Sequence, residues 1–77
     1  MKFKFLDRVV LKDDLPEHGL KAGDLGTVVE TYTPDGVEVE FMTAGGETVA
    51  VLTLKDKDVR LPDEGEIVSV RQLTAGV

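Results

Sequence analysis

Short runs in which apolar and polar residues alternate recur along this chain of 77 residues, and each run is bounded by Gly, Pro or Asp. Alternation with a period of two residues is typical of a strand that is buried on one side, whereas an amphipathic helix has apolar residues every three or four positions. No segment has the helical period. The sequence therefore predicts an all-β protein.

The clearest pair of runs is TVVETY (residues 27–32) and VEVEF (residues 37–41), which flank Thr33-Pro34-Asp35-Gly36. Pro presets φ at the first central position of a turn, and Asp suits the second. We expect Gly36 to adopt the left-handed geometry of a bulged hairpin. These residues therefore predict a β-hairpin.

The second strand of this hairpin alternates strictly between apolar and acidic residues. Val37, Val39 and Phe41 are expected on the core side, and Glu38 and Glu40 on the solvent side, because successive side chains of a strand point to opposite faces. Such alternation indicates a sheet that is covered on one face only.

Further strands are predicted at residues 8–12, 48–54 and 58–61. The small barrels that such strands form often have a single 3₁₀ turn at a corner like the one around residues 55–57. Together with the hairpin, these segments give five short strands, and a long polar connection separates the first two. This pattern describes a small, partly open barrel. Residues 66–73 (EIVSVRQL) can form a sixth strand. We expect one domain over residues 1–77, with a core at 5–61 and a C-terminal extension at 62–77.

Two of these strands have less regular patterns. In the strand at residues 8–12, Val9 and Leu11 are expected on one face and Val10 on the other. In the strand at residues 48–54, one face is expected to carry Ala50, Leu52 and Leu54, and the other Val49, Val51 and Thr53.

Several segments resemble one known family: DLPEHGL (residues 14–20), GDLGTVVE (23–30), EVEF (38–41) and LTL (52–54). In combination they are similar to small stand-alone bacterial proteins of the domain of unknown function 4926 family, over roughly residues 5–61. The resemblance implies an SH3-like barrel and a cytoplasmic, bacterial protein. It brings no catalytic or binding residues to carry over.

A looser resemblance is to the KOW motif of ribosomal proteins and transcription elongation factors, whose outline Gly23, Gly26 and Val28 match. That motif implies nucleic-acid binding. The loop of this chain differs, since Lys21 stands beside Asp24. The whole chain has 15 acidic and 9 basic residues, a net charge of −6. Because a nucleic-acid interface needs clustered Lys and Arg, the charge disfavours this function.

The composition excludes several kinds of site and of protein. The chain has no Cys, so disulfides and thiolate metal sites are excluded, and no apolar run approaches the length of a membrane span. We find no secretory leader pattern and expect a cytoplasmic protein.

No cofactor, metal site or catalytic residue is predicted. Asp13, Asp14, Glu17 and His18 form an oxygen-rich loop, but their spacing is not that of a calcium loop, and a solvated loop with Asp14 capping a turn explains them. His18 is the only histidine and has no nucleophile motif near it, so we expect a protein that is not an enzyme.

The glycines of the loop have a structural explanation. A phosphate-binding loop precedes a helix, whereas a strand follows Gly26 here. We expect Gly26 to permit a close approach of the backbone where the loop enters the barrel.

Tyr32 is the only tyrosine, and the chain has no Trp. Domains that bind proline-rich peptides line their groove with several aromatic residues, so this function is disfavoured. We expect Tyr32 to cover the rim of the barrel with its hydroxyl in water.

Glu30, Glu38 and Glu40 are predicted to share the outer face of the hairpin. One interpretation is that these carboxylates are simply solvated, since charge on an exposed face also protects a sheet against aggregation. The alternative is that Glu30, Tyr32, Glu38 and Glu40 form a platform that binds a basic partner. Binding of such a partner would explain why the sheet tolerates the repulsion between like charges.

The function we predict is a non-enzymatic protein-interaction module that binds a basic protein. One version is an accessory or neutralising subunit, antitoxin-like or immunity-like, that covers the nucleic-acid-binding surface of an effector. A KOW-like nucleic-acid-binding module is the alternative. A homodimer in which residues 66–73 pair across chains is a third interpretation.

Overall fold

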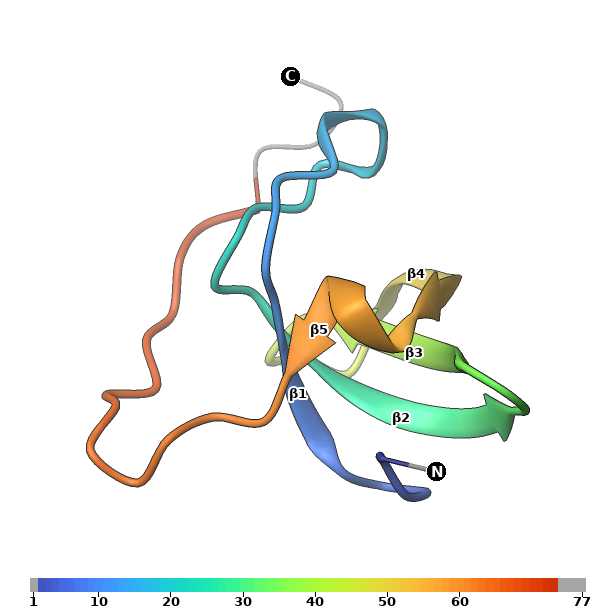
Figure 1. Cartoon of the computed structure of the whole chain (residues 1–77). Helices are drawn as coiled ribbons and strands as arrows, with labels where there is room; N and C mark the ends of the chain where they lie inside the picture. Colours follow the sequence, from blue (N-terminus) through green and yellow to red (C-terminus); the bar gives the residue numbers. More distant parts are fainter. Residues whose placement is uncertain (1, 74–77) are drawn as a thin grey trace.

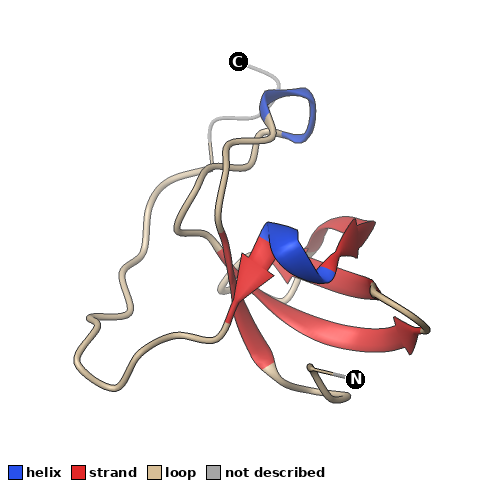
Figure 2. Ribbon diagram, viewed as in Figure 1, coloured by secondary structure: helices blue, strands red, loops and turns tan. Residues whose placement is uncertain are grey.

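The computed structural model describes residues 2–73, which fold around one antiparallel sheet of five strands in the order β4-β3-β2-β1-β5 (Figures 1 and 2). Its elements are β1 (Arg8–Leu11), η1 (Pro16–His18), β2 (Leu25–Tyr32), β3 (Gly36–Met42), β4 (Thr48–Lys55), η2 (Asp56–Asp58) and β5 (Val59–Arg60), where η denotes a 3₁₀ helix. The all-β prediction is confirmed. The sheet is not closed into a barrel, because β4 and β5 lie at its two edges and do not pair.

The hairpin of β2 and β3 forms as predicted, but its turn differs. The Thr33–Pro34 peptide bond is cis, and Gly36 is the first residue of β3, outside the left-handed region. The prediction for Gly36 was wrong. In the next hairpin Gly46 does adopt a positive φ, of 91°.

The core lies on one side of the sheet. The predicted core residues of β3, Val37, Val39 and Phe41, are buried, as are Phe3, Val9, Leu11, Leu20, Val28 and Val59. Burial of these side chains is the main source of folding free energy in a chain that has no disulfide.

Side chains of β3 pack directly on the backbone of Gly26 in β2. A Cβ atom built there would lie 2.5 Å from Val39 Cγ1 and 2.9 Å from Phe41 Cε1. No side chain fits at these distances, so the predicted close approach at Gly26 is confirmed.

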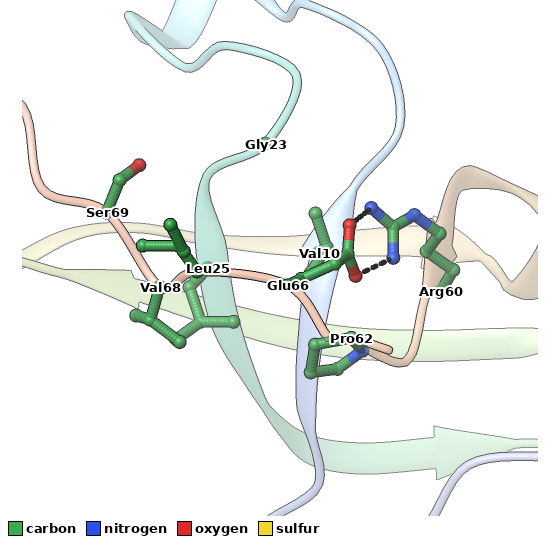
Figure 3. A pocket seen from close by; sticks show the side chains of 9 residues that line it. Val10, Gly23, Leu25, Arg60, Pro62, Glu66, Val68 and Ser69 are labelled. Carbon is green, nitrogen blue, oxygen red and sulfur yellow. Dashed lines mark hydrogen bonds and ion pairs between the residues drawn. The ribbon is translucent and has the colours of Figure 1, made fainter. Parts of the chain in front are cut away.

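Val10 is buried outside the core cluster that contains Val9 and Leu11, in keeping with its predicted place on the other face of β1. The chain after β5 passes over Val10 and Leu25 and covers them (Figure 3). One assignment of a strand face was wrong. Val49 packs partly against the core, as Ala50 does, because the pairing of β3 and β4 shifts between Phe41 and Met42.

Residues 62–73, called the tail below, contain no strand, so the sixth strand is not present. Two ion pairs hold the tail against the body of the protein instead. Arg60 donates to both carboxylate oxygens of Glu66 at 2.7 and 2.6 Å (Figure 3). Arg71 donates to both carboxylate oxygens of Asp24, at 2.8 and 2.5 Å, and to the Gly19 carbonyl at 3.0 Å. These contacts replace the hydrogen bonds that a sixth strand would make.

Candidate functional site

The register of β2 and β3 brings the three predicted carboxylates together on the outer face of the sheet. Glu30 lies directly opposite Glu38, and Glu40 is two residues further along β3 on the same side. Tyr32 lies two residues from Glu30 on that side of β2. We call these four residues the acidic face.

Hydroxyl groups hold the carboxylates of Glu38 and Glu40, whereas Glu30 Oε1 accepts a hydrogen bond from the Thr31 N–H at 3.1 Å. Tyr32 donates from its hydroxyl to Glu38 Oε1 at 2.9 Å, and Thr53 donates to the same oxygen at 3.4 Å. Thr48 donates to Glu40 Oε2 at 2.7 Å. Tyr32 is exposed, as predicted, but its hydroxyl also donates to a carboxylate that the sequence did not indicate, because the strand pairing places Glu38 within its reach.

The hydrogen bond to Glu38 changes the acidity of the phenol. Ionisation of Tyr32 would break this bond and would put a phenolate beside two carboxylates. The bond to Glu38, together with partial desolvation and the negative charges of Glu38 and Glu30, raises the pKa of Tyr32 above its ordinary value of 10.0.

No Lys or Arg within residues 2–73 forms an ion pair with a carboxylate of the acidic face. The ion pairs of this part of the chain are Lys55–Asp35, Arg60–Glu66 and Arg71–Asp24. Arg8 shares a row of the sheet with Glu40, across Thr27, without an ion pair to it. The negative charge of the acidic face is therefore available to a partner.

Apolar side chains accompany the carboxylates. Tyr32, Val51 and Met42 are each about half exposed, and Val51 lies directly opposite Glu40. Two hollows beneath the tail are lined by other residues for the most part, although Glu40 borders the larger one, of about 690 Å³. Glu30, Tyr32 and Glu38 thus form an open surface, whereas small-molecule sites are usually concave.

The loop before β2, which resembles the KOW outline, is closed by its own carboxylates. Asp14 Oδ1 accepts a hydrogen bond from the Ala22 N–H at 2.9 Å, which is the predicted capping role. Asp24 Oδ2 accepts one from the Lys21 N–H at 2.9 Å. The pKa of Asp24 lies below its ordinary value. Burial alone would raise this pKa, but the hydrogen bonds from Arg71 and from the Lys21 N–H outweigh the effect of burial. Carboxylates at these positions oppose binding of phosphate.

Asp13, Glu17 and His18 are exposed on and around η1. Among residues 2–73 no group of three or more His, Asp or Glu side chains has a geometry that could hold a metal ion. Over the same residues, the structure has no helix long and apolar enough to span a membrane.

A comparison with protein-family models identifies the family. The model of a domain of unknown function, DUF4926, matches residues 5–61. The chain belongs to the DUF4926 family. The matched region contains all five strands and the whole acidic face, whereas the tail lies beyond it. Neither the search of curated proteins nor that of solved structures returned a match.

Sequence reasoning missed Thr53, which supports the acidic face of this DUF4926 protein, and Arg71, which attaches the tail. Thr53 could have been found, since the alternation in β4 places it opposite Glu38 once the register is known. Arg71 could not, because its contact with Asp24 joins residues 47 positions apart and depends on the path of the tail.

Proposed function

We propose that this DUF4926 protein is a non-enzymatic interaction module whose acidic face docks onto a basic surface of another protein. The observation that carries the proposal is the placement of Glu30 directly opposite Glu38, without a basic side chain to neutralise either within residues 2–73. Like charges in this position destabilise a sheet. A partner that supplies positive charge removes that cost on binding and gains rate and selectivity from the complementary charge.

The composition of the acidic face supports a protein as the partner. Interfaces between proteins are enriched in Tyr and Met and contain apolar area between polar groups. Tyr32, Val51 and Met42 supply such area next to the carboxylates. The hydrogen bonds from Tyr32 and Thr48 also fix Glu38 and Glu40 before binding, which reduces the loss of side-chain entropy on docking.

In the specific form we favour, the partner is an effector that uses a basic surface to bind nucleic acid, and the acidic face covers that surface. The protein then acts as a neutralising subunit. Nucleic acid itself is disfavoured as a ligand, because the net charge is −6 and Arg60 and Arg71 are occupied by ion pairs.

Affinity capture from the host tests this proposal with matched baits. The test bait carries Glu30→Gln, Glu38→Gln and Glu40→Gln, and the control bait carries Asp13→Asn, Glu17→Gln and Glu64→Gln, which are exposed positions away from the acidic face. Each set removes three negative charges from the net of −6 and leaves −3.

A basic protein retained by the wild type and by the control bait, and lost from the test bait, would support the proposal. Equal retention by all three baits, or retention of nucleic acid alone at low salt, would contradict it.

A further inference from the structure

The tail exposes apolar side chains to an unusual degree. Ile67 is 91% exposed and Val70 is 94% exposed, and Val68 between them is also mostly exposed. These residues are β-branched, a type that favours strands and is usually buried. A single exposed apolar residue needs no explanation, but three in one short segment indicate a surface that is covered in the functional state.

The backbone of this segment is also free to pair. From residue 67 to residue 73, no N–H donates to a backbone carbonyl elsewhere in residues 2–73. The two ion pairs hold the segment by residues close to its ends, Glu66 and Arg71. Because these anchors limit its conformations, less entropy is lost when the segment pairs with a strand.

A complementary surface exists on the same chain, at the outer edge of β4. This strand has 8 residues, pairs on one side with β3 and has no strand on its other side within residues 2–73. Natural edge strands are protected by charge, Pro or short length, but β4 carries no charged residue before Lys55. The opposite edge is protected, since β5 has 2 residues and is followed closely by Pro62.

We propose that residues 66–73 of one copy add as a strand to the β4 edge of a second copy. The segment and the edge match in length, since β4 also spans 8 residues. Pairing would satisfy backbone groups of both. It would place Val68 and Val70, which share one face of a strand, beside the half-buried Leu52 and Leu54, and Ile67 on the other face, the side of Val51. Within one chain, Arg71 holds the tail to the loop before β2, and no backbone hydrogen bond joins residues 66–73 to β4.

This association goes beyond the proposed function and leaves it intact. Strand addition at an edge extends the sheet in its own plane, so the outer face of β2 and β3 stays open to a basic partner. Failure of one proposal therefore does not entail failure of the other.

The test combines two variants of the full chain. A tail variant, Ile67→Glu with Val70→Glu, removes the apolar contacts, and these positions are exposed enough to accept Glu without loss of folding. An edge variant, Val51→Lys, places a charge on β4 opposite Glu40, where an ion pair is compatible with the folded sheet. Glu38→Gln serves as a control that changes the acidic face alone.

Sedimentation as a function of protein concentration gives the first result. The wild type and Glu38→Gln are expected to self-associate, and the tail variant and the edge variant to remain monomeric. An equal mixture of the two variants is expected to form a dimer and nothing larger, because it retains one intact tail and one intact edge. If two tails or two β4 edges paired with each other instead, mixing the two variants would not produce this dimer of one variant with the other.

Hydrogen exchange gives the second result. Amides of residues 67–73 are expected to exchange rapidly in dilute wild-type protein and at least tenfold more slowly once it associates, with protection of β4 rising in parallel. A wild type that is monomeric at every soluble concentration, or a tail variant that associates as the wild type does, would overturn the proposal. A tail that is protected only by a different protein would overturn it as well.

Discussion

The hydroxyl of Tyr32 donates a hydrogen bond of 2.9 Å to Glu38 Oε1, from the last residue of β2 to the middle of β3. This bond links the only tyrosine of the chain to the carboxylate at the centre of the acidic face. Because of this bond, the pKa of the phenol depends on the charge of Glu38.

The first prediction concerns the titration of that phenol. Since the chain has one Tyr and no Trp, ultraviolet absorbance of the phenolate reports Tyr32 alone. We expect a pKa above 10.0, because Glu38 accepts the hydroxyl proton in the hydrogen bond and repels a phenolate. Glu38→Gln should lower the pKa of Tyr32 toward its ordinary value, while Glu64→Gln should leave it unchanged. An unaltered titration in Glu38→Gln would show that the bond does not form in solution.

The second prediction concerns Gly26. Gly26→Ala places a Cβ 2.5 Å from Val39 Cγ1, so the contact between β2 and β3 must widen. We expect the free energy of unfolding to fall by about 1–3 kcal/mol, the usual cost of an extra methyl group in a packed core. Denaturant unfolding measures this loss. Gly65→Ala is the matched control, because a Cβ atom at that position would contact nothing within 4 Å and the φ of Gly65 is not positive, so its effect should be close to zero.

The third prediction concerns the attachment of the tail at low pH. Hydrogen bonds from Arg60 and from the Asp63 N–H lower the pKa of Glu66 from 4.5 to about 2. A lowered carboxyl pKa stabilises the attached state above the ordinary pKa, and this stabilisation is lost as the pH falls from about 4.5 through about 2. Amide chemical shifts of residues 67–70 should therefore change in this range. The change should be absent from Glu66→Gln, and a midpoint near 4.5 for Glu66 would exclude the ion pair.

The fourth prediction concerns the repulsion within the acidic face. Glu30→Gln removes one of two carboxylates that lie directly opposite each other, so the free energy of unfolding should rise by a few tenths of a kcal/mol, up to about 1 kcal/mol. Because salt screens exposed charges, the gain should shrink as salt is added. Glu64→Gln, on the exposed chain after β5, should change stability less. Destabilisation by Glu30→Gln would mean that the carboxylate stabilises the sheet by a contact other than those described.

The sequence predicted what depends on local pattern. The strict alternation in β3 located Val37, Val39 and Phe41 in the core, and it located Glu38 and Glu40 on the other face. The strand after Gly26 was found for the same reason, because nearby residues determine it, whereas the 3₁₀ turn at η2 was expected from the architecture.

What depends on distant contacts could not be predicted. Burial of Val10 requires the tail to pass over β1, and attachment of the tail requires Arg71 to meet Asp24. Val49 was assigned to the wrong face because a shift in pairing beside Phe41 has no local sequence pattern. The alternation in residues 66–73 is that of a strand, but the ion pair at each end holds them away from the sheet.

The affinity of a captured basic partner for three purified proteins tests the central claim most directly. The proteins are the wild type, the variant with Gln at positions 30, 38 and 40, and the control with equal charge, Asp13→Asn, Glu17→Gln and Glu64→Gln. We expect the control to bind nearly as the wild type does and the test variant to bind at least tenfold more weakly, with a smaller dependence on salt. Equal affinities of the test variant and the control would show that only net charge attracts the partner, and would contradict docking on the acidic face.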